Sequence, residues 1–311
     1  MRKRQNIQLI VLAAVAVALA VLLALMPVLF PPETMELVEL HTIDVFSVEE
    51  SSVQKLSWTY EGKSFQIVKN GQSWYYASEP ELELDLLSVE AMLDKVCEVK
   101  ADSVIEQPDS LGVYGLEKPA AEVTVTTATG EKTFLIGATT GLGSDRFLSA
   151  GDGKIYRVSS SIIMPFRYSI EGVVKKEAVP SVGTAETITV TNVGYTVPIQ
   201  LKEKADGTTA WFSGEQELNS TAVSKLLSPA VQMRWRECVA YNAEDFAQYG
   251  LDTPVATLTV TEGETSQTVE FGASAGEKKI YARISGSSYV YTVDTSITDP
   301  LVEMTLISLL P

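Results

Sequence analysis

The sequence predicts an α+β protein in which an N-terminal transmembrane helix is followed by two tandem, homologous repeats built on antiparallel sheets. Three observations support this prediction. Residues 9–30 carry no charge, and the string LGVYGLEKP at 111–119 returns as FAQYGLDTP at 246–254. Short alternating runs rich in β-branched and aromatic residues surround both strings, as is typical of strands. The 311 residues are enough for two domains, each with its own core.

The N-terminal segment is predicted to cross a membrane. Residues 9–30 would rise about 33 Å as a helix, which is enough to span a hydrocarbon core. Arg2, Lys3 and Arg4 precede the segment, so a tail of residues 1–8 is expected in the cytoplasm and the bulk of the chain outside. A cleaved signal peptide is the alternative, but the following LMPVLFPPE offers bulky residues at the place where cleavage needs small ones.

The charge balance is acidic, with 24 basic and 40 acidic residues and a net charge of −16. Without the three basic residues before the anchor, 21 basic residues stand against 40 acidic ones, which gives −19. Such a surface repels nucleic acid and anionic lipid, so no nucleic-acid partner is expected. Solubility of an exported domain explains the charge. Capture of cations or of a basic partner is the alternative.

The repeat has a period of 135 residues. At that shift about 17 of the 49 positions from 114 to 162 are identical without a gap, whereas chance would give about three. A period this long predicts two domain-sized copies, at 45–180 and 181–311, after a linker of residues 31–44. The motif shared by the copies is Tyr114, Gly115, Leu116 and Pro119 in the first, and Tyr249, Gly250, Leu251 and Pro254 in the second.

Each copy is predicted to open with three strands and a helix. The strands are expected at 53–60, 64–70 and 73–77, and again at 186–191, 195–203 and 209–214; Asn-Gly and Asp-Gly pairs mark two of the hairpins. Asp85 and Asn219 are candidate caps of the two helices. Leu86, Val89, Leu93 and Val96 recur at helical spacing in the first helix, and Pro229 is expected to end or kink the second.

The repeated motif is interpreted as a turn device. An acidic residue or Ser starts a short helix, and the glycine closes it in the left-handed conformation. The proline then prevents the helix from resuming. A meander over 121–160, with its counterpart over 256–294, is expected to form a second sheet after the turn. Equivalent positions in both copies favour a structural role for Tyr114 and Tyr249 over a catalytic one.

The motif and the strands after it resemble a known family. The pattern Asp/Glu-x-x-x-Tyr-Gly-Leu-Asp/Glu-x-Pro, a Thr/Val-rich hairpin ending in Ile/Phe-Gly and then Ile/Val-Tyr-x-Val is similar to the bacterial domain of unknown function 4340. The resemblance covers almost everything after the anchor. It implies an anchored auxiliary subunit of ABC-type export systems, including gliding-motility-like permease components. The family provides no catalytic residues that could be transferred to this chain.

Few residues suggest a catalytic, metal-binding or ligand-binding role. His41 is the sole histidine, which excludes zinc sites that need several. Ser52 and Lys55 match only the shortest piece of a serine acyltransferase signature, and the GDGK at 151–154 is interpreted as a hairpin turn. In an extended segment Glu79, Glu81 and Glu83 would share one face next to Asp85. We interpret these residues as a solvated acidic edge, with a cation site as the less favoured alternative. Trp74 and Trp211 are interpreted as sheet anchors, with carbohydrate stacking as the alternative.

The two cysteines, Cys97 and Cys238, do not occupy matching positions in the repeats. Two buried free thiols are expected, and an oxidising compartment would also permit a disulfide between them.

From these observations we expect a non-enzymatic, membrane-anchored binding or auxiliary subunit on the outer side of the membrane. Its partner would be a protein such as an ABC-type permease. No cofactor, metal or catalytic residue is predicted. A cell-surface scaffold or adhesive module is the main alternative, followed by an envelope hydrolase.

Overall fold

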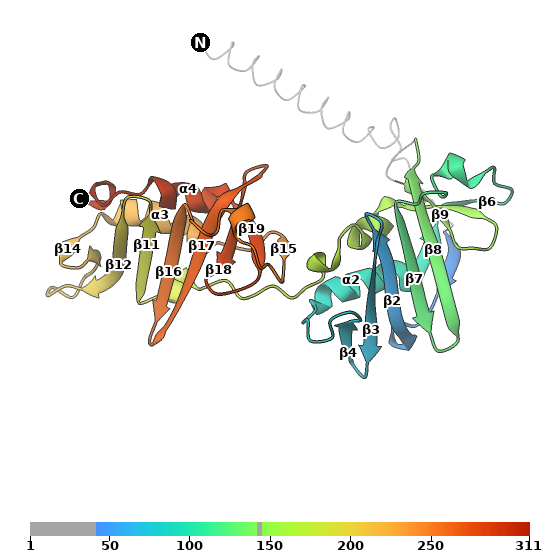
Figure 1. Ribbon diagram of the computed structural model, residues 1–311, viewed down its shortest axis with the longest axis horizontal. Helices are drawn as coiled ribbons and strands as arrows, with labels where there is room; N and C mark the ends of the chain where they lie inside the picture. Colours follow the sequence, from blue (N-terminus) through green and yellow to red (C-terminus); the bar gives the residue numbers. More distant parts are fainter. Residues whose placement is uncertain (1–41, 142–144) are drawn as a thin grey trace, which may run out of the picture. The chain divides into compact units, whose positions relative to one another are not determined.

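The computed structural model describes residues 42–141 and 145–311, which form antiparallel sheets covered by short helices (Figure 1). The cytoplasmic tail, the membrane helix at 9–30, most of the linker and His41 lie outside the described residues. No helix within the described ranges is long and apolar enough to cross a membrane. Residues 42–311 make up one compact unit. Its division at 180 into two repeats stays a prediction.

The first sheet has eight antiparallel strands in the order β4-β3-β2-β7-β8-β9-β10-β6. The strands are β2 (Val53–Tyr60), β3 (Lys63–Asn70), β4 (Ser73–Tyr76), β6 (Ser103–Ile105), β7 (Ala121–Thr127), β8 (Gly130–Thr139), β9 (Asp145–Ser149) and β10 (Ile155–Ser159). A hairpin joins β3 to β4 where the sequence predicts one, but its two turn residues are Gly71 and Gln72, because Asn70 still pairs with Ser73.

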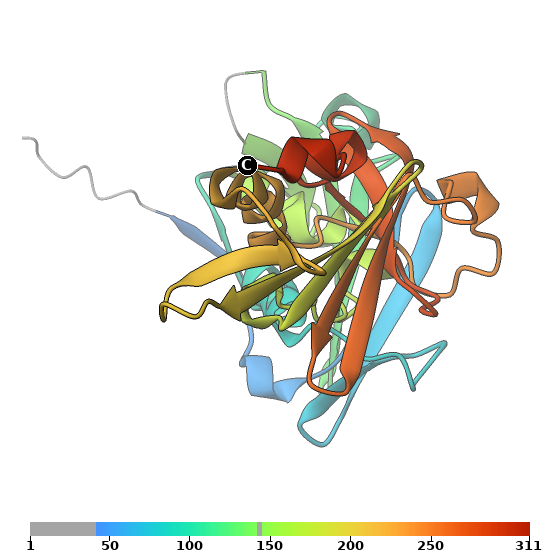
Figure 2. The same cartoon turned by 90° about the vertical axis from the view of Figure 1, so that its left-hand side faces the viewer.

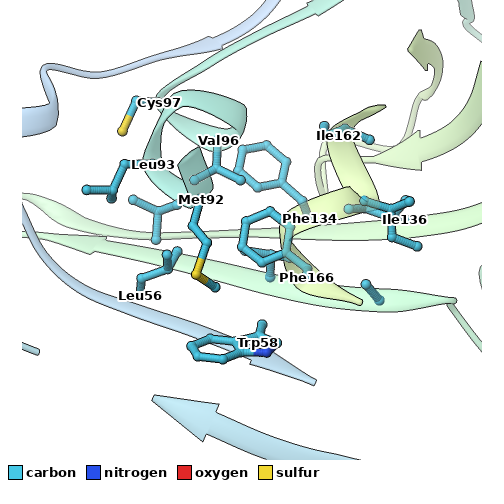
Figure 3. Packing of buried hydrophobic residues seen from close by; sticks show 14 of the residues in the cluster. Leu56, Trp58, Met92, Leu93, Val96, Cys97, Phe134, Ile136, Ile162 and Phe166 are labelled. Atoms are coloured by element: carbon cyan, nitrogen blue, oxygen red, sulfur yellow. The ribbon is translucent and has the colours of Figure 1, made fainter. Parts of the chain in front are cut away.

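The core of this sheet lies under helix α2 (Leu86–Cys97) and the 3-10 segment η3 (Ser160–Phe166). Met92 of α2 and Phe166 of η3 lie over the strand that carries Trp58 (Figure 3). The indole Nε1 of the buried Trp58 donates to the carbonyl of Tyr168 at 2.8 Å, which ties the segment after η3 to the sheet. A small second sheet pairs β1 (Ile43–Ser47) with β5 (Glu98–Ala101).

The other large sheet repeats this strand order, with one short strand added at its edge: β14-β13-β12-β11-β16-β17-β18-β19-β15. Its strands are β11 (Thr187–Asn192), β12 (Thr196–Glu203), β13 (Thr209–Ser213), β14 (Gln216–Glu217), β15 (Cys238–Ala240), β16 (Ala256–Glu262), β17 (Thr265–Gly276), β18 (Lys279–Ile284) and β19 (Val290–Asp294). Helices α3 (Ser220–Val231) and α4 (Thr295–Glu303) contact each other on one side of this sheet (Figure 2).

The expectation of a second sheet after the repeated motif is wrong for both copies. β7 pairs with β2, and β16 pairs with β11, so the meander extends the sheet that the first three strands begin. The physical reason is that β2 and β11 would otherwise be open edges, and pairing their free backbone groups with the meander removes those edges. The fold therefore has one large sheet per copy.

Three details of the helices also differ from expectation. Leu86 is 55% exposed, so the buried stripe of α2 starts at Val89 and includes Met92. Pro229 does not end α3, which continues to Val231. Pro229 has no N–H to bond back to the carbonyl of Lys225, and the helix ends two residues after it. Asn219 caps α3 through the amide N–H of Ala222, whereas Asp85 accepts from the Ser88 hydroxyl and not from a backbone N–H.

The segment that follows the first sheet, residues 175–186, is called the connector. Its Glu177 binds the edge of the second sheet. The backbone N–H of Glu177 donates to the Tyr291 hydroxyl at 2.9 Å, and its carbonyl accepts from Trp235 Nε1 at 2.9 Å. The rings of Trp235 and Tyr291 stack with centroids 4.5 Å apart. The connector is thereby fixed on the aromatic edge formed by these residues.

Candidate interaction surface

The repeated motif forms a short turn of 3-10 helix in each copy. In the first, η2 (Leu111–Tyr114) ends at Gly115, whose φ of 68° is left-handed, and Tyr114 and Leu116 are buried. Pro119 is half-buried just before β7. The Tyr114 ring meets Phe147 of β9 edge-on at 5.0 Å. The Tyr114 and Leu116 side chains are thus packed into the protein, whereas Leu111 and Val113 of the same turn are exposed.

The second copy of the motif has the same construction. Segment η6 (Ala247–Tyr249) ends at Gly250 with φ 67°, and Leu251 is buried, while Pro254 is half-buried. The Tyr249 ring meets Tyr281 edge-on at 5.1 Å. Strand pairing makes Tyr281 the counterpart of Phe147, because Leu148 pairs with Ile136 as Ala282 pairs with Phe271. The ungapped alignment misses this equivalence by one residue.

The remaining candidates from the sequence do not converge. The Ser52 hydroxyl donates to the Glu49 carbonyl at 2.7 Å, while the Lys55 ammonium pairs with Glu131 at 3.0 Å. The GDGK segment lies between β9 and β10 as a hairpin turn. Trp74 is buried in β4 with the Lys69 ammonium 5.7 Å from its ring, and Trp211 is half-buried in β13.

The acidic segment is not extended, so Glu79, Glu81 and Glu83 do not share one face. A turn forms where the amide of Leu82 donates to the Glu79 carbonyl. Glu79 accepts from the Tyr241 hydroxyl at 2.7 Å, and Glu83 pairs with Lys175 at 2.6 Å. The described residues contain no group of three or more acidic, Cys or His side chains placed to hold a metal ion.

Both cysteines are buried free thiols, one in the core of each sheet. Burial raises the pKa of Cys97 to about 11 and that of Cys238 to about 12. The thiolate is the reactive form of cysteine, so these protonated thiols are poor nucleophiles at neutral pH.

A cleft of about 790 Å³ lies beside β15 and is lined by residues of both sheets. Most of its charges are already paired: Arg236 with Asp294, and Lys279 with Glu237 at 3.0 Å. Its thiol is the protonated Cys238. Paired charges around a protonated thiol favour a structural junction over a site for nucleophilic chemistry.

A different surface stands out on the second sheet, where the β11–β12 hairpin meets the end of α4. The side-chain amide of Asn192 donates to the carbonyls of Leu301 at 3.0 Å and Met304 at 2.7 Å. Its side-chain oxygen accepts from the backbone amides of Gly194 and Tyr195, both at 3.0 Å. One side chain thus fixes the hairpin tip against the C-terminal end of the helix.

Two adjoining hollows of about 210 and 250 Å³ flank this contact, and we call them together the apolar groove. They share Val255, Val302 and Glu303 in their walls. Three apolar side chains at the groove are open to solvent, with exposures of 95% for Val193, 40% for Tyr195 and 44% for Val302. A cluster of exposed apolar side chains around a hollow is typical of surfaces that bind another protein.

The charged side chains that line the groove in the described part of the chain are all acidic. Asp299 and Glu303 of α4 are among its lining residues, and no Lys or Arg belongs to that lining as far as the structure describes the chain. A cationic group brought to this surface would therefore meet carboxylates and no like charge.

Sequence reasoning missed the apolar groove because no helix was predicted at residues 295–303, where Pro300 stands inside the segment and argues against a helix. One signal was present: Val193 and Tyr195 flank the glycine of a hairpin turn, a place where polar residues are usual. Two apolar residues at such a tip are unusual for a turn that only faces water.

The comparisons with known proteins agree with the resemblance noted in the sequence. The family model described as "Domain of unknown function (DUF4340)" matches residues 74–227 and again residues 212–304. The two matches begin at corresponding strands, β4 and β13. No match was found among curated proteins or among solved structures.

Proposed function

This chain belongs to the family of the domain of unknown function DUF4340, and we propose that it is a non-enzymatic, membrane-anchored subunit that binds a protein partner outside the cytoplasm. The proposal gives the protein a binding role carried by the described sheets and an anchoring role carried by its N-terminal segment.

The observation that carries the proposal is the apolar groove. Val193, Tyr195 and Val302 expose apolar surface around a hollow whose geometry is fixed by the Asn192 hydrogen bonds. A rigid hollow of this kind retains its shape when a partner binds, so little conformational entropy is lost on association. The small volume of each hollow suits side chains of a protein better than a large metabolite.

The membrane attachment supports the same role. The uncharged residues 9–30 after a basic tail are the sequence of a single-pass anchor with its N-terminus in the cytoplasm. An anchored domain meets a membrane-bound partner at a raised local concentration, so a modest groove is sufficient for stable association.

The likeness of the two large sheets also bears on the proposal, through the family to which they belong. We propose that the two sheets descend from one ancestral repeat, since they share a strand order and begin their family matches at corresponding strands. The resemblance to the family also points to an ABC-type export complex as the assembly that this subunit joins.

Crosslinking in native membranes tests the proposal. Intact cells carrying the tagged full chain are treated with an amine-reactive crosslinker that does not cross the membrane, and adducts are identified by mass spectrometry. The proposal predicts adducts with a permease or another envelope protein. Adducts with wall polymers alone would instead support a surface scaffold or adhesive module, and the absence of specific adducts would contradict the proposal.

A further inference from the structure

We infer that the apolar groove of the second sheet binds an apolar segment of the partner protein that carries at least one Lys or Arg. This inference rests on the proposed function and adds to it the place of binding and the chemistry of the bound segment.

The first step is to find the counterpart of the groove in the first sheet. Trp58 pairs with Val123, and Val190 pairs with Leu258. Val123 and Leu258 are the same position at the 135-residue shift, so Trp58 and Val190 correspond. Both strands then run two residues further into a hairpin turn with glycine at its second position.

Counting along these hairpins gives the equivalent residues. Val193 takes the position of Glu61, and Tyr195 takes the position of Lys63. On the helical side, Pro165 and Pro300 correspond at the 135-residue shift, which places Val302 at the position of Arg167. The pairs of equivalent residues are Glu61 with Val193, Lys63 with Tyr195, and Arg167 with Val302.

All three positions are charged in the first sheet and apolar in the second. Glu61, Lys63 and Arg167 are exposed, as expected for charged residues at a hairpin tip and a helix end. The same scaffold therefore tolerates charge at these places, so folding alone does not require apolar residues there. Keeping Val193 at 95% exposure leaves apolar surface in water, and a binding partner that covers it provides the physical reason.

The chemistry of the occupant follows from the charge of the groove. Asp299 and Glu303 line it without a basic residue among its described lining. A segment with apolar side chains fills the hollows, and its Lys or Arg meets these carboxylates. A second copy of this chain fits less well, because its net charge of −16 repels an equally acidic surface.

A peptide-binding experiment tests the inference on the full chain, reconstituted in nanodiscs of zwitterionic lipid. The probes are two fluorescent 12-residue peptides, one of Leu and Lys and one of Leu and Glu. Binding is measured by anisotropy, with empty nanodiscs subtracted. The Leu/Lys peptide should bind, and the Leu/Glu peptide should not.

The variants locate the binding. Val193→Glu and Val302→Arg introduce the residues of the first sheet, and Glu303→Lys reverses a charge of the groove. Each should weaken binding of the Leu/Lys peptide about tenfold or more, as for a residue central to an interface. The matched control is Leu87→Glu, which places the same charge at an apolar residue of α2 that is 74% exposed and lies outside the groove.

Several outcomes would overturn the inference. They are equal binding of both peptides, equal loss in the Leu87→Glu control, or no loss in any groove variant. A dimer in mass photometry that Val193→Glu abolishes would make a second copy the occupant. The proposed function is judged separately: permease crosslinks that survive Val193→Glu would leave that function standing and remove the groove as the binding place.

Discussion

A Cβ atom added to Gly137 of β8 would lie 2.3 Å from the carbonyl oxygen of Tyr114, and one added to Gly272 of β17 would lie 2.2 Å from that of Tyr249. The repeated Tyr-Gly-Leu turn therefore sits directly on the backbone of a sheet strand in both copies. This explains why a Gly-Ala pair recurs together with the motif at the 135-residue shift. In each copy, the repeated string therefore marks the same contact between a turn and a strand.

Replacing Gly137 by Ala should destabilise the protein by about 1–3 kcal/mol, because the new methyl group must displace the turn. Chemical denaturation followed by tryptophan fluorescence measures the change. Gly183→Ala is the control, since a Cβ at that glycine meets nothing within 4 Å. Equal stability of Gly137→Ala and the wild type would contradict the close contact.

The connector gives a second prediction. Tyr291→Phe removes the hydroxyl that accepts from the Glu177 amide and donates to its carboxylate at 3.2 Å. The carboxylate keeps its bond from the Ser287 hydroxyl, but the Glu177 amide loses its acceptor, which should cost about 1–3 kcal/mol of unfolding free energy. Tyr156→Phe is the matched control at the corresponding strand position, where the hydroxyl donates to Asp152 alone among the described residues. A larger loss in Tyr156→Phe than in Tyr291→Phe would contradict this account of the connector.

The thiols give a prediction about pH. In the folded chain the pKa of Cys97 rises from 9.0 to about 11 and that of Cys238 to about 12, chiefly through burial. Between these values the unfolded chain binds fewer protons than the folded one, so stability should fall as pH rises above about 9. Urea denaturation at pH 8 and pH 10.5 measures the fall.

Tyrosines also titrate in that range, so the double variant Cys97→Ala, Cys238→Ala serves as the comparison. Its stability should fall less between the two pH values than that of the wild type. At pH 8, the native wild type should react slowly with a disulfide reagent, and the urea-unfolded chain should react quickly. Fast reaction of both thiols in the native protein would show that they are accessible.

Asn192 provides a test of how the apolar groove is held. Asn192→Ala removes the bonds to the carbonyls at the end of α4 and to the hairpin amides, and should cost about 1–3 kcal/mol. Binding of the Leu/Lys peptide should weaken as well, because the hairpin tip is released. Asn70→Ala, at an exposed hairpin position, should change neither property. Unchanged hydrogen exchange of the Gly194 and Tyr195 amides in Asn192→Ala would contradict the role of this side chain.

The sequence predicts the local elements of the fold well. The strand Val53–Tyr60, the hairpin around Gly71 and the left-handed Gly115 all follow from nearby residues, and the structure confirms them. Alternation, turn chemistry and glycine conformation act over a few residues, so they can be read from a short string.

Long-range features were less predictable. The pairing of β2 with β7 joins residues about 70 positions apart, and no local pattern distinguishes it from a separate second sheet. The sequence places the acidic residues on one face only if their segment is extended, and its actual course depends on distant partners, since Glu79 bonds to Tyr241 and Glu83 pairs with Lys175. The apolar groove needs both the β11–β12 hairpin and α4, so only the three-dimensional arrangement brings its residues together.

The central claim, that this protein binds a partner outside the cytoplasm, is tested most directly at a single position. A photo-crosslinking amino acid at Val193 of the full chain is activated in intact cells, and the adducts are compared with those from the equivalent position, Glu61. The account predicts an adduct with an envelope protein at Val193 only, mapped to an apolar segment that contains Lys or Arg. Adducts of equal amount and identity at both positions, or none at Val193, would contradict it.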